Sequence, residues 1–562
     1  MDEEARRILG QTQSHRVDHL PIVKAYCQRL GLIDTLNTLV ESEMTVSVGV
    51  IVQAMVIDTL SGRSPLYRLS TFFAKLDTEL LIGCQVAPGA FNDTTVGRAL
   101  DRIYDVGAQA IFSQLAWKAC QLHQCDLKHL HFDTTSVSVH GDYLTTDPNA
   151  SEHLNITHGY SKDKRPDLKQ FLLQTLCVEK NIPLLGGCED GNTSDKTINN
   201  QVLSQLTRNL GKYGLQPGAF IYIADSAMVT EDNLNLLDGN RFITRLPATY
   251  LECDRAIHDA VAAGSWKDIG VIAETRPTKN RPVAQYRVAE SQVTLYGRNY
   301  RAVVVHSSAH DKRRQKRLLK TLTDEQQRLQ TIIKQAVAIS YACRTDAESA
   351  CQRLEATRSE YYSLKAQVIE KVIYQRGRPS PDQPRKINRR EYHIVADIQA
   401  KQAAIERRQT EAGCFVMLTS VPEEGEDGYS GEAILRAYKD QHGVERNFSF
   451  LKDPLIVNDL FLKKPERIEV LGMILLIALL IWNLMERNMR QSLTEPRQTL
   501  PGWDNKRTQR PTSFMMTTKF LGIMILVFNG TRILANPLTP TQQSYLTALG
   551  LSVKIFTDPD PP

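Results

Sequence analysis

The stretch LKHLHFDTTSVSV, residues 127–139, decides the fold that we expect for this chain. It alternates apolar and polar side chains and is rich in β-branched residues, which is typical of a half-buried strand. Asp133 is the exception, because a carboxylate that leaves water needs a hydrogen-bonding partner or a cation. The remaining question is which other residues of the chain could share its surroundings.

The next residues along the chain predict more of the same sheet. DLKQFLLQTLCVEK (167–180) and PLLGGCED (183–190) predict two strands joined by a short turn. A helix from Thr193, a short strand in AFIYIADSA (219–227), a second helix and the strand NRFITRLP (240–247) come after them. Three strands, a helix, a strand, a helix and a strand form the order of a ribonuclease H-like sheet, in which the first and fourth strands are neighbours.

We therefore expect an α/β chain with a ribonuclease H-like mixed sheet, an N-terminal helical domain and a large insertion. The insertion should hold strands and a long helical hairpin over about 309–374, a stretch without proline or glycine. The expected segments are a helical domain that is either a plain bundle or a DNA-binding one (1–120), the first part of the core that carries the sheet (121–246), the insertion (247–410), the second part of the core (411–490), and a C-terminal helical region and tail (491–562).

Composition indicates a globular protein rather than a disordered one, with 42% hydrophobic and 23% charged residues and a net charge of +5. The ten cysteines form no Cys-x-x-Cys pair, so we expect reduced thiols in a cytoplasmic protein.

The apolar runs at 470–485 and 520–528 are shorter than a membrane span needs. We interpret both as buried core helices, and no signal peptide is evident at the N-terminus.

Two other acidic residues are candidates for the surroundings of Asp133. Asp225 comes directly after a short strand, and the end of a strand is where α/β sheets usually bind ligands. Glu445 lies on a predicted helix that comes after the strand at 414–420. If the three carboxylates meet, they would suit two divalent cations about 4 Å apart, Mg²⁺ or Mn²⁺, with Asp133 bridging the ions.

The predicted helix that carries Glu445 gives a second indication. At 3.6 residues per turn, Tyr438, Gln441, Glu445 and Lys452 fall on one face. A phenol, an amide and an ammonium beside a carboxylate would suit a DNA backbone near the scissile bond. A solvent-facing side of the helix could show the same pattern by chance.

These motifs together resemble the DDE transposases of bacterial insertion sequences, in the group with the Tyr-x-x-Arg-x-x-x-Glu-x-x-x-x-x-x-Lys signature. YKDQHGVERNFSFLK (438–452) keeps that spacing, although Gln441 replaces Arg. HFDTTSVSV resembles the family's first-Asp strand, and HGYSKDKRPDLKQ (158–170), DGNTSD (190–195) and IADSA resemble the family's later motifs in their usual order. The resemblance covers roughly residues 120–490.

The resemblance implies a metal-dependent enzyme that binds terminal inverted repeats of double-stranded DNA, cleaves at the element ends and joins the freed 3′-hydroxyl to target DNA. It also implies a homodimer on DNA and no membrane association. In related enzymes a tryptophan of the insertion stacks on a flipped base. Trp266 is the one tryptophan in this insertion, although a core position is the more ordinary interpretation. Further DNA contacts are expected from basic residues that could equally be solvated: Lys162, Lys164, Arg165, Lys312, Arg313, Arg314, Lys316 and Arg317.

Two alternatives stay open. The chain could be a catalytically inactive, DNA-binding derivative, although Asp133, Asp225 and Glu445 are all present. It could also be a metal-dependent nuclease of the same fold that cuts DNA but does not transfer strands.

Overall fold

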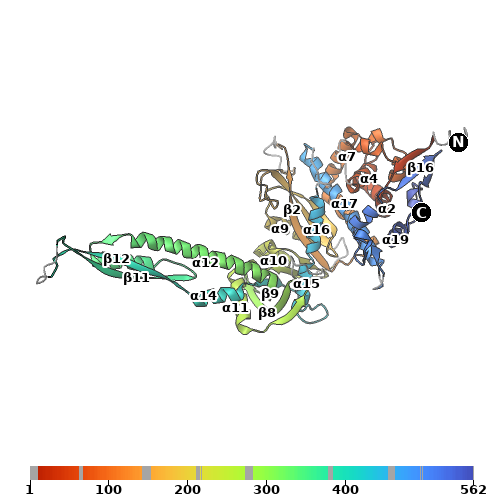
Figure 1. Cartoon of the computed structure of the whole chain (residues 1–562). Helices are drawn as coiled ribbons and strands as arrows, with labels where there is room; N and C mark the ends of the chain where they lie inside the picture. Colours follow the sequence, from red (N-terminus) through yellow and green to blue (C-terminus); the bar gives the residue numbers. More distant parts are fainter. Residues whose placement is uncertain are drawn as a thin grey trace. The chain divides into compact units, whose positions relative to one another are not determined.

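The computed structural model describes residues 11–61, 68–141, 143, 153–209, 216, 218–272, 283–377, 384–453, 462–493, 495 and 498–560. The chain divides into two compact units (Figure 1). Unit 1 comprises residues 1–244 and 437–562, and unit 2 comprises residues 245–436. The second unit is therefore inserted, in sequence, into the first.

The sheet of unit 1 has the strand order that the sequence predicts. Its strands are β2 (His129–Val139), β3 (Lys169–Val178), β4 (Ile182–Glu189), β5 (Ile221–Ile223) and β6 (Arg241–Arg245). They run in the order β4-β3-β2-β5-β6. The first three are antiparallel neighbours, whereas β5 pairs in parallel with both β2 and β6. The mixed α/β class and the adjacency of the first and fourth strands are confirmed, and α9 (Asp195–Asn209) and α10 (Glu231–Leu236) are the expected connecting helices.

The N-terminal part is mainly helical in its described residues, as predicted, apart from a short strand at Gln13–Arg16. Asn92 caps α7 by accepting a hydrogen bond from the N–H of Thr95. Gly107, with φ at +102°, separates α7 from α8. The helices are α2 (Leu20–Arg29), α3 (Leu32–Leu39), α4 (Val48–Leu60), α5 (Leu69–Phe73), α6 (Thr78–Ile82), α7 (Asp93–Val106) and α8 (Ala108–Leu122).

The apolar run at 470–485 lies in α17 (Pro465–Gln491), which packs against β4 and against α4, α7 and α8. By length and composition α17 could cross a membrane, but 89% of its most apolar window is buried inside the protein. Arg467 also pairs with Asp101 of α7 through two contacts of 2.7 Å. This is the packing of a core helix, as predicted, which joins the sheet to the N-terminal helices.

The run at 520–528 is not a helix, and that prediction was wrong. Its second half forms β16 (Met524–Phe528), which pairs with β17 (Thr531–Leu534) and with β1 (Gln13–Arg16) near the other end of the chain. Asn529 and Gly530 connect the hairpin, both with positive φ, as a tight turn requires. The C-terminal region also contains β14 (Leu500–Pro501), β15 (Arg507–Thr508), α18 (Ser513–Lys519) and α19 (Pro540–Leu549).

Unit 2 contains an antiparallel sheet and a long arm. The sheet runs β13-β9-β8-β7, from β7 (Lys267–Val271), β8 (Gln285–Leu295), β9 (Arg298–Ser307) and β13 (Cys414–Thr419), with α11 (Leu251–Ala263) and α14 (Gln402–Glu411) nearby. The arm consists of α12 (Ser308–Val337), β10 (Ser340–Tyr341), α13 (Arg344–Glu355), β11 (Tyr362–Tyr374) and β12 (Ile387–Ala400) (Figure 1).

The predicted helical hairpin over 309–374 is therefore half wrong. Its first arm is the 30-residue helix α12, but the second arm is a short helix succeeded by the strand β11. β11 pairs with β12 along its whole length, and Leu364 and Ile394 pack with Leu329 of α12 in one apolar cluster. The β-branched residues in QVIEKVI favour this strand, and absence of proline and glycine does not exclude one.

β13, which was expected from the sequence in the second part of the core, pairs with β9 from Cys414↔His306 to Thr419↔Arg301 and falls within unit 2. Unit 2 extends to residue 436, within α15 (Gly431–Lys439).

One buried ion pair fixes the C-terminal hairpin to the N-terminal helices. Arg532 of β17 contacts Asp77 at 2.6 Å, and both side chains are at most 7% exposed. Burial alone would raise the pKa of Asp77, but hydrogen bonds from Arg532 and from the N–H of Leu80 outweigh it and hold the pKa below its usual value.

We predict that Arg532→Met lowers the free energy of unfolding by about 3–5 kcal/mol at pH 7, because Asp77 is left buried and unpaired.

Since the folded-state pKa of Asp77 is depressed, this contribution is present above the unfolded pKa and is lost as the pH falls towards the folded value. Denaturant unfolding at pH 7 and pH 3 should show the difference shrink at low pH. The control is Arg16→Met, which removes an exposed pair with Asp18 and should cost at most about 1 kcal/mol. Equal losses for the two variants would contradict the prediction.

Candidate active site

Parallel pairing of β2 with β5 aligns Asp133 with Asp225. His131 and Ile223 form the last pair between β2 and β5. Asp133 lies two residues after His131, and Asp225 lies two residues after Ile223. Side chains two residues apart point to the same face of a strand, and neighbouring strands are about 4.8 Å apart. The ladder thus brings together two of the three predicted carboxylates, which lie 92 positions apart in the sequence (225 − 133).

Asp133 is half-buried, and its Oδ1 accepts a hydrogen bond from the N–H of Thr134 at 2.8 Å. The pKa of Asp133 is raised to about 7, mainly because the side chain is buried; repulsion by Asp225 and Asp195 adds to the rise, whereas the positive charge of Lys162 and the Thr134 N–H oppose it. The charged carboxylate is therefore poorly stabilised, and a bound cation would stabilise it.

Asp225 lies two residues after the end of β5, and its side chain caps the turn that comes next. Its Oδ1 accepts from the N–H of Ala227 at 3.0 Å, and its carbonyl oxygen accepts from the hydroxyl of Thr244 at 2.7 Å. Burial, and to a lesser extent Asp195, raise the pKa of Asp225. Asp225 thus caps the turn, and this contact fixes its carboxylate next to Asp133.

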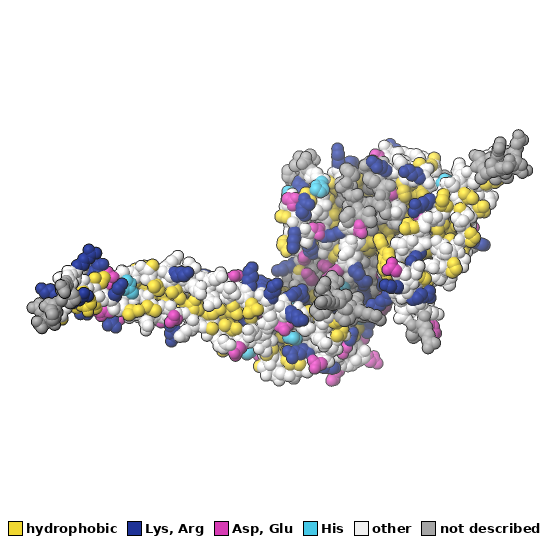
Figure 2. Space-filling model, viewed as in Figure 1, with side chains coloured by type: hydrophobic (Ala, Val, Ile, Leu, Met, Phe, Trp, Pro, Cys, Tyr) yellow, Lys and Arg dark blue, Asp and Glu magenta, His cyan; other side chains and the backbone are white. Residues whose placement is uncertain are grey.

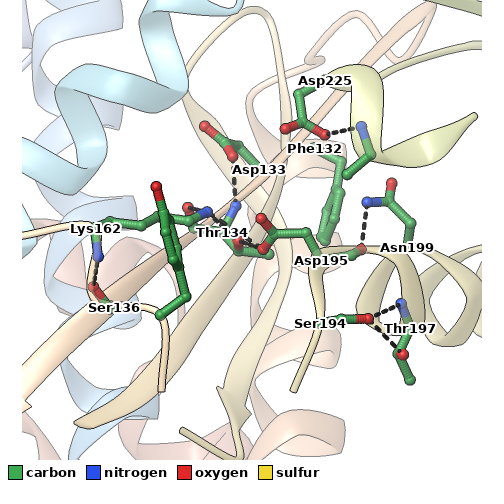
Figure 3. A network of polar contacts seen from close by, with 12 residues as sticks. Phe132, Asp133, Thr134, Ser136, Lys162, Ser194, Asp195, Thr197, Asn199 and Asp225 are labelled. Carbon is green, nitrogen blue, oxygen red and sulfur yellow. Dashed lines mark hydrogen bonds and ion pairs between the residues drawn. The ribbon is translucent and has the colours of Figure 1, made fainter. Parts of the chain in front are cut away.

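A third aspartate and a lysine, which sequence reasoning did not place here, complete the cluster (Figure 3). Asp195, the first residue of α9, accepts a hydrogen bond from the Thr134 hydroxyl at 2.5 Å. Lys162 Nζ donates to the carbonyl and hydroxyl oxygens of Thr134 at 2.8 and 2.7 Å and lies 3.3 Å from Asp195 Oδ1. Lys162, which stays a predicted DNA contact, has its ammonium against Thr134 and Asp195 in this structure.

The sequence signal for Asp195 is the stretch DGNTSD, whose last residue it is. The backbone N–H of Lys162 also donates to Ser136 of β2 at 3.0 Å, so the loop that carries HGYSKDKRPDLKQ lies against the first-Asp strand. Two motifs quoted from the sequence thus meet at Thr134.

Glu445 is not in this cluster. It lies in the first turn of α16 (His442–Leu451), its side chain is 61% exposed, and its Oε2 is 2.7 Å from His442 Nδ1. α16 nevertheless packs against β2, because Gln441 Nε2 donates to the carbonyl of Phe132, the residue before Asp133, at 3.3 Å. A side chain at Gly443 would collide with the Lys180 carbonyl, so glycine permits this close approach.

The single helix predicted to carry the Tyr438-to-Lys452 face is in fact two helices. α15 ends at Lys439 and α16 begins at His442, with i→i−3 hydrogen bonds between them. Gln441 is only 9% exposed and its amide is bound to β2, so it positions α16 rather than facing a phosphate. Lys452 Nζ pairs with Asp163 at 2.6 Å, and Tyr438 is half-buried.

The other predicted DNA contacts are dispersed. Arg165 pairs with Asp167 at 2.7 Å, and Lys164 is exposed. Trp266 of unit 2 has the guanidinium of Arg287 over its ring, 4.8 Å from the centroid, so a cation already covers one face of the indole. Of the basic residues on α12, Lys312, Arg313, Lys316 and Arg317 are exposed or partly exposed, and Arg314 is half-buried.

The donor set suits a hard cation. In the part of the chain that the structure describes, no group of three or more His, Cys, Asp or Glu side chains is arranged to hold a metal. Asp133 and Asp225, however, each use Oδ1 for a backbone N–H, which fixes the carboxylate plane and leaves Oδ2 for another ligand. Mg²⁺ is commonly held by one or two carboxylates with water and substrate phosphate, so this pair fits such an ion.

Comparison with known proteins reaches only the N-terminal helices. A family model described as a domain of unknown function (DUF4277) matches residues 12–117. No curated protein matches the chain. The matched residues include none of the carboxylate cluster.

We predict that Asp133→Asn stabilises the metal-free protein at pH 8. Because the folded-state pKa of Asp133 is raised, its favourable contribution is present below the unfolded pKa and is lost as the pH rises towards about 7. Thermal unfolding in EDTA should show a melting temperature a few degrees higher for the variant at pH 8, and a smaller difference at pH 5. Asp167→Asn, at a carboxyl whose pKa Arg165 lowers, should give no gain. A loss of stability in Asp133→Asn at pH 8 would contradict the electrostatic description.

Proposed function

We propose that the chain is a transposase of the DDE type. It would bind the terminal inverted repeats of an insertion sequence, hydrolyse a phosphodiester at each end and transfer the freed 3′-hydroxyl to target DNA. The observation that carries the proposal is that Asp133 and Asp225 lie close together, each two residues beyond the last pair formed between the parallel strands β2 and β5 (Figure 3). The motifs that resemble this family support it, because two of them meet at Thr134 beside Asp133.

Asp133 and Asp225 would hold a divalent ion, Mg²⁺ or Mn²⁺, and Glu445 would complete the site for a second ion. When bound, the ions would supply Lewis-acid stabilisation of the attacking and leaving oxygens. In the hydrolytic step a water attacks phosphorus and the 3′-oxygen leaves. In the joining step that 3′-hydroxyl attacks the phosphorus of a target phosphodiester, the new P–O bond forms, and the target's own 3′-oxygen leaves as a hydroxyl. To complete the site, the Glu445 carboxylate would leave its contact with His442 and move towards the aspartates. Its exposed position leaves room for this movement.

Lys162 would balance the charge of the carboxylates before the ions and DNA arrive. Its ammonium lies against Asp195 and Thr134, and its charge lowers the pKa of both Asp133 and Asp225. Since Lys452 pairs with Asp163, one residue after Lys162, both lysines are held close to the strand that carries Asp133. Either could contact the DNA backbone when the carboxylates bind metal.

The proposed partners are double-stranded DNA and, on that DNA, a second copy of the chain. The two alternatives remain distinct in their products. An inactive derivative would bind element ends without nicking them, and a nuclease would nick them without joining. Incubation of the protein with Mg²⁺, labelled end-sequence DNA and a target plasmid separates all three outcomes.

We predict that Glu445→Gln lowers the rate of end cleavage by about a hundredfold or more, because the third metal-binding charge is lost. Binding to end DNA in EDTA should change little. Glu432→Gln on α15 is the matched control, since this residue pairs with Arg436 on the same helix. Cleavage by Glu445→Gln at the wild-type rate would show that Glu445 is wrongly assigned.

A further inference from the structure

Unit 2 contains a cavity beside the N-terminal half of α12. Its volume is about 320 Å³, which is at the lower end of the range for ligand pockets. The end of β6, α11, α12, α14 and β13 all contribute to its walls. Four of the residues that line it are arginines: Arg245, Arg314, Arg317 and Arg408.

Arg408 is neutralised by its neighbours. It lies 3.3 Å from Glu360, 3.7 Å from Asp254 and 3.8 Å from Glu411. Glu411 is in turn bound by Arg407 at 2.9 Å. The carboxylates of the cavity wall are therefore already paired and do not serve the remaining three arginines.

Those three guanidinium groups converge without a counter-charge. In the described residues, Arg245, Arg314 and Arg317 have no carboxylate partner within 4.0 Å. Arg245 lies over the ring of Phe415, 4.9 Å from its centroid, and Arg314 Nε donates to His310 Nε2 at 3.4 Å. Burial lowers the pKa of Arg314, and the charges of Arg245, Arg317 and Arg408 lower it further, so these groups repel one another.

The helix periodicity separates this set from the other basic residues of α12. Arg314, Arg317, Leu318 and Thr321 line the cavity, and their i, i+3, i+4, i+7 spacing places them on one face. The neighbouring cations Lys312, Arg313, Lys316 and Lys320 do not line it. Figure 2 shows Lys and Arg side chains (dark blue) at several places on the surface of this unit.

We propose that the cavity binds a phosphate group of the DNA backbone, through Arg245, Arg314 and Arg317. Guanidinium groups donate paired hydrogen bonds that match phosphate oxygens. Ile257, Leu318 and Phe415 form apolar parts of the wall, and a less polar wall strengthens the attraction between the charges. The other cations on the same helix favour a polyanion over a single phosphate ion. The choice of DNA rests on the proposed function, whereas the anion site rests on the arginines alone.

The test compares two charge-removing double variants of the full chain, with a third double variant that keeps the charge. Arg314→Gln with Arg317→Gln removes two charges from the cavity. Arg313→Gln with Lys316→Gln removes two charges from the same turns of α12 outside it. Circular dichroism and thermal unfolding establish that both variants fold, and Arg314→Lys with Arg317→Lys separates charge from the paired geometry.

Two probes are used in EDTA. Fluorescence anisotropy with a short labelled DNA duplex, at several salt concentrations, should show about tenfold weaker binding for the cavity variant at moderate salt and a salt slope lower by about 1. The outer variant should lose markedly less affinity. Calorimetry with pyrophosphate should show binding to the wild type and to the outer variant, and none to the cavity variant.

The outcomes are distinguishable. Equal loss of DNA affinity in both double variants, or none in either, would overturn the assignment of the cavity to DNA. If pyrophosphate binding needs the cavity arginines while duplex binding does not, the site takes free phosphates and the DNA assignment is wrong. If the wild type binds pyrophosphate but no duplex at all, the proposed function fails while the anion site stands. Absence of pyrophosphate binding in the wild type would overturn the anion site itself.

Discussion

The candidate chemistry depends on one ladder of backbone hydrogen bonds, between β2 and β5. Because these strands are parallel, equivalent positions on them lie side by side, and the pairing of His131 with Ile223 places Asp133 next to Asp225. A shift of one residue would turn one carboxylate to the opposite face of the sheet. The aspartates are thus brought together by the sheet, while Asp195, Lys162 and α16 are held around them by side-chain contacts.

The cluster concentrates negative charge and balances it only in part. Asp133, Asp225 and Asp195 repel one another, which helps to raise the pKa of the first two, and Lys162 supplies a single positive charge. The same imbalance with opposite sign occurs in unit 2, where Arg245, Arg314 and Arg317 face one cavity. Excess carboxylate suits a cation and excess guanidinium suits an anion, and a metal-dependent enzyme acting on DNA would need both.

The sequence predicted the sheet of unit 1 well, because alternation, apolar runs and turn residues mark strands locally. Prediction from the sequence failed where a segment becomes a strand because it pairs with residues elsewhere in the chain. β11 is a strand because β12 pairs with it, and β16 is a strand because it pairs with β17 and β1. The Asn529–Gly530 pair is the one local signal of that second hairpin, since both residues tolerate the positive φ of a tight turn.

At the site, Asp133 and Asp225 could be found from the strands that carry them, but their surroundings could not. Lys162 resembled an ordinary loop lysine, and only the folded loop shows its ammonium beside Thr134. Gln441 matched a signature position for contact with DNA, yet its amide binds the backbone of β2. A sequence gives the residue types and their spacing along the chain, whereas the partner of each polar group depends on tertiary packing.

The most direct measurement is the position of a bound metal. Crystals of the full chain soaked in Mn²⁺ should show an anomalous scattering peak at about 2.2 Å from carboxylate oxygens of both Asp133 and Asp225. That result would establish the two strands as the base of a metal site. A peak held by other residues, or none at these aspartates when Mn²⁺ is saturating, would contradict the account.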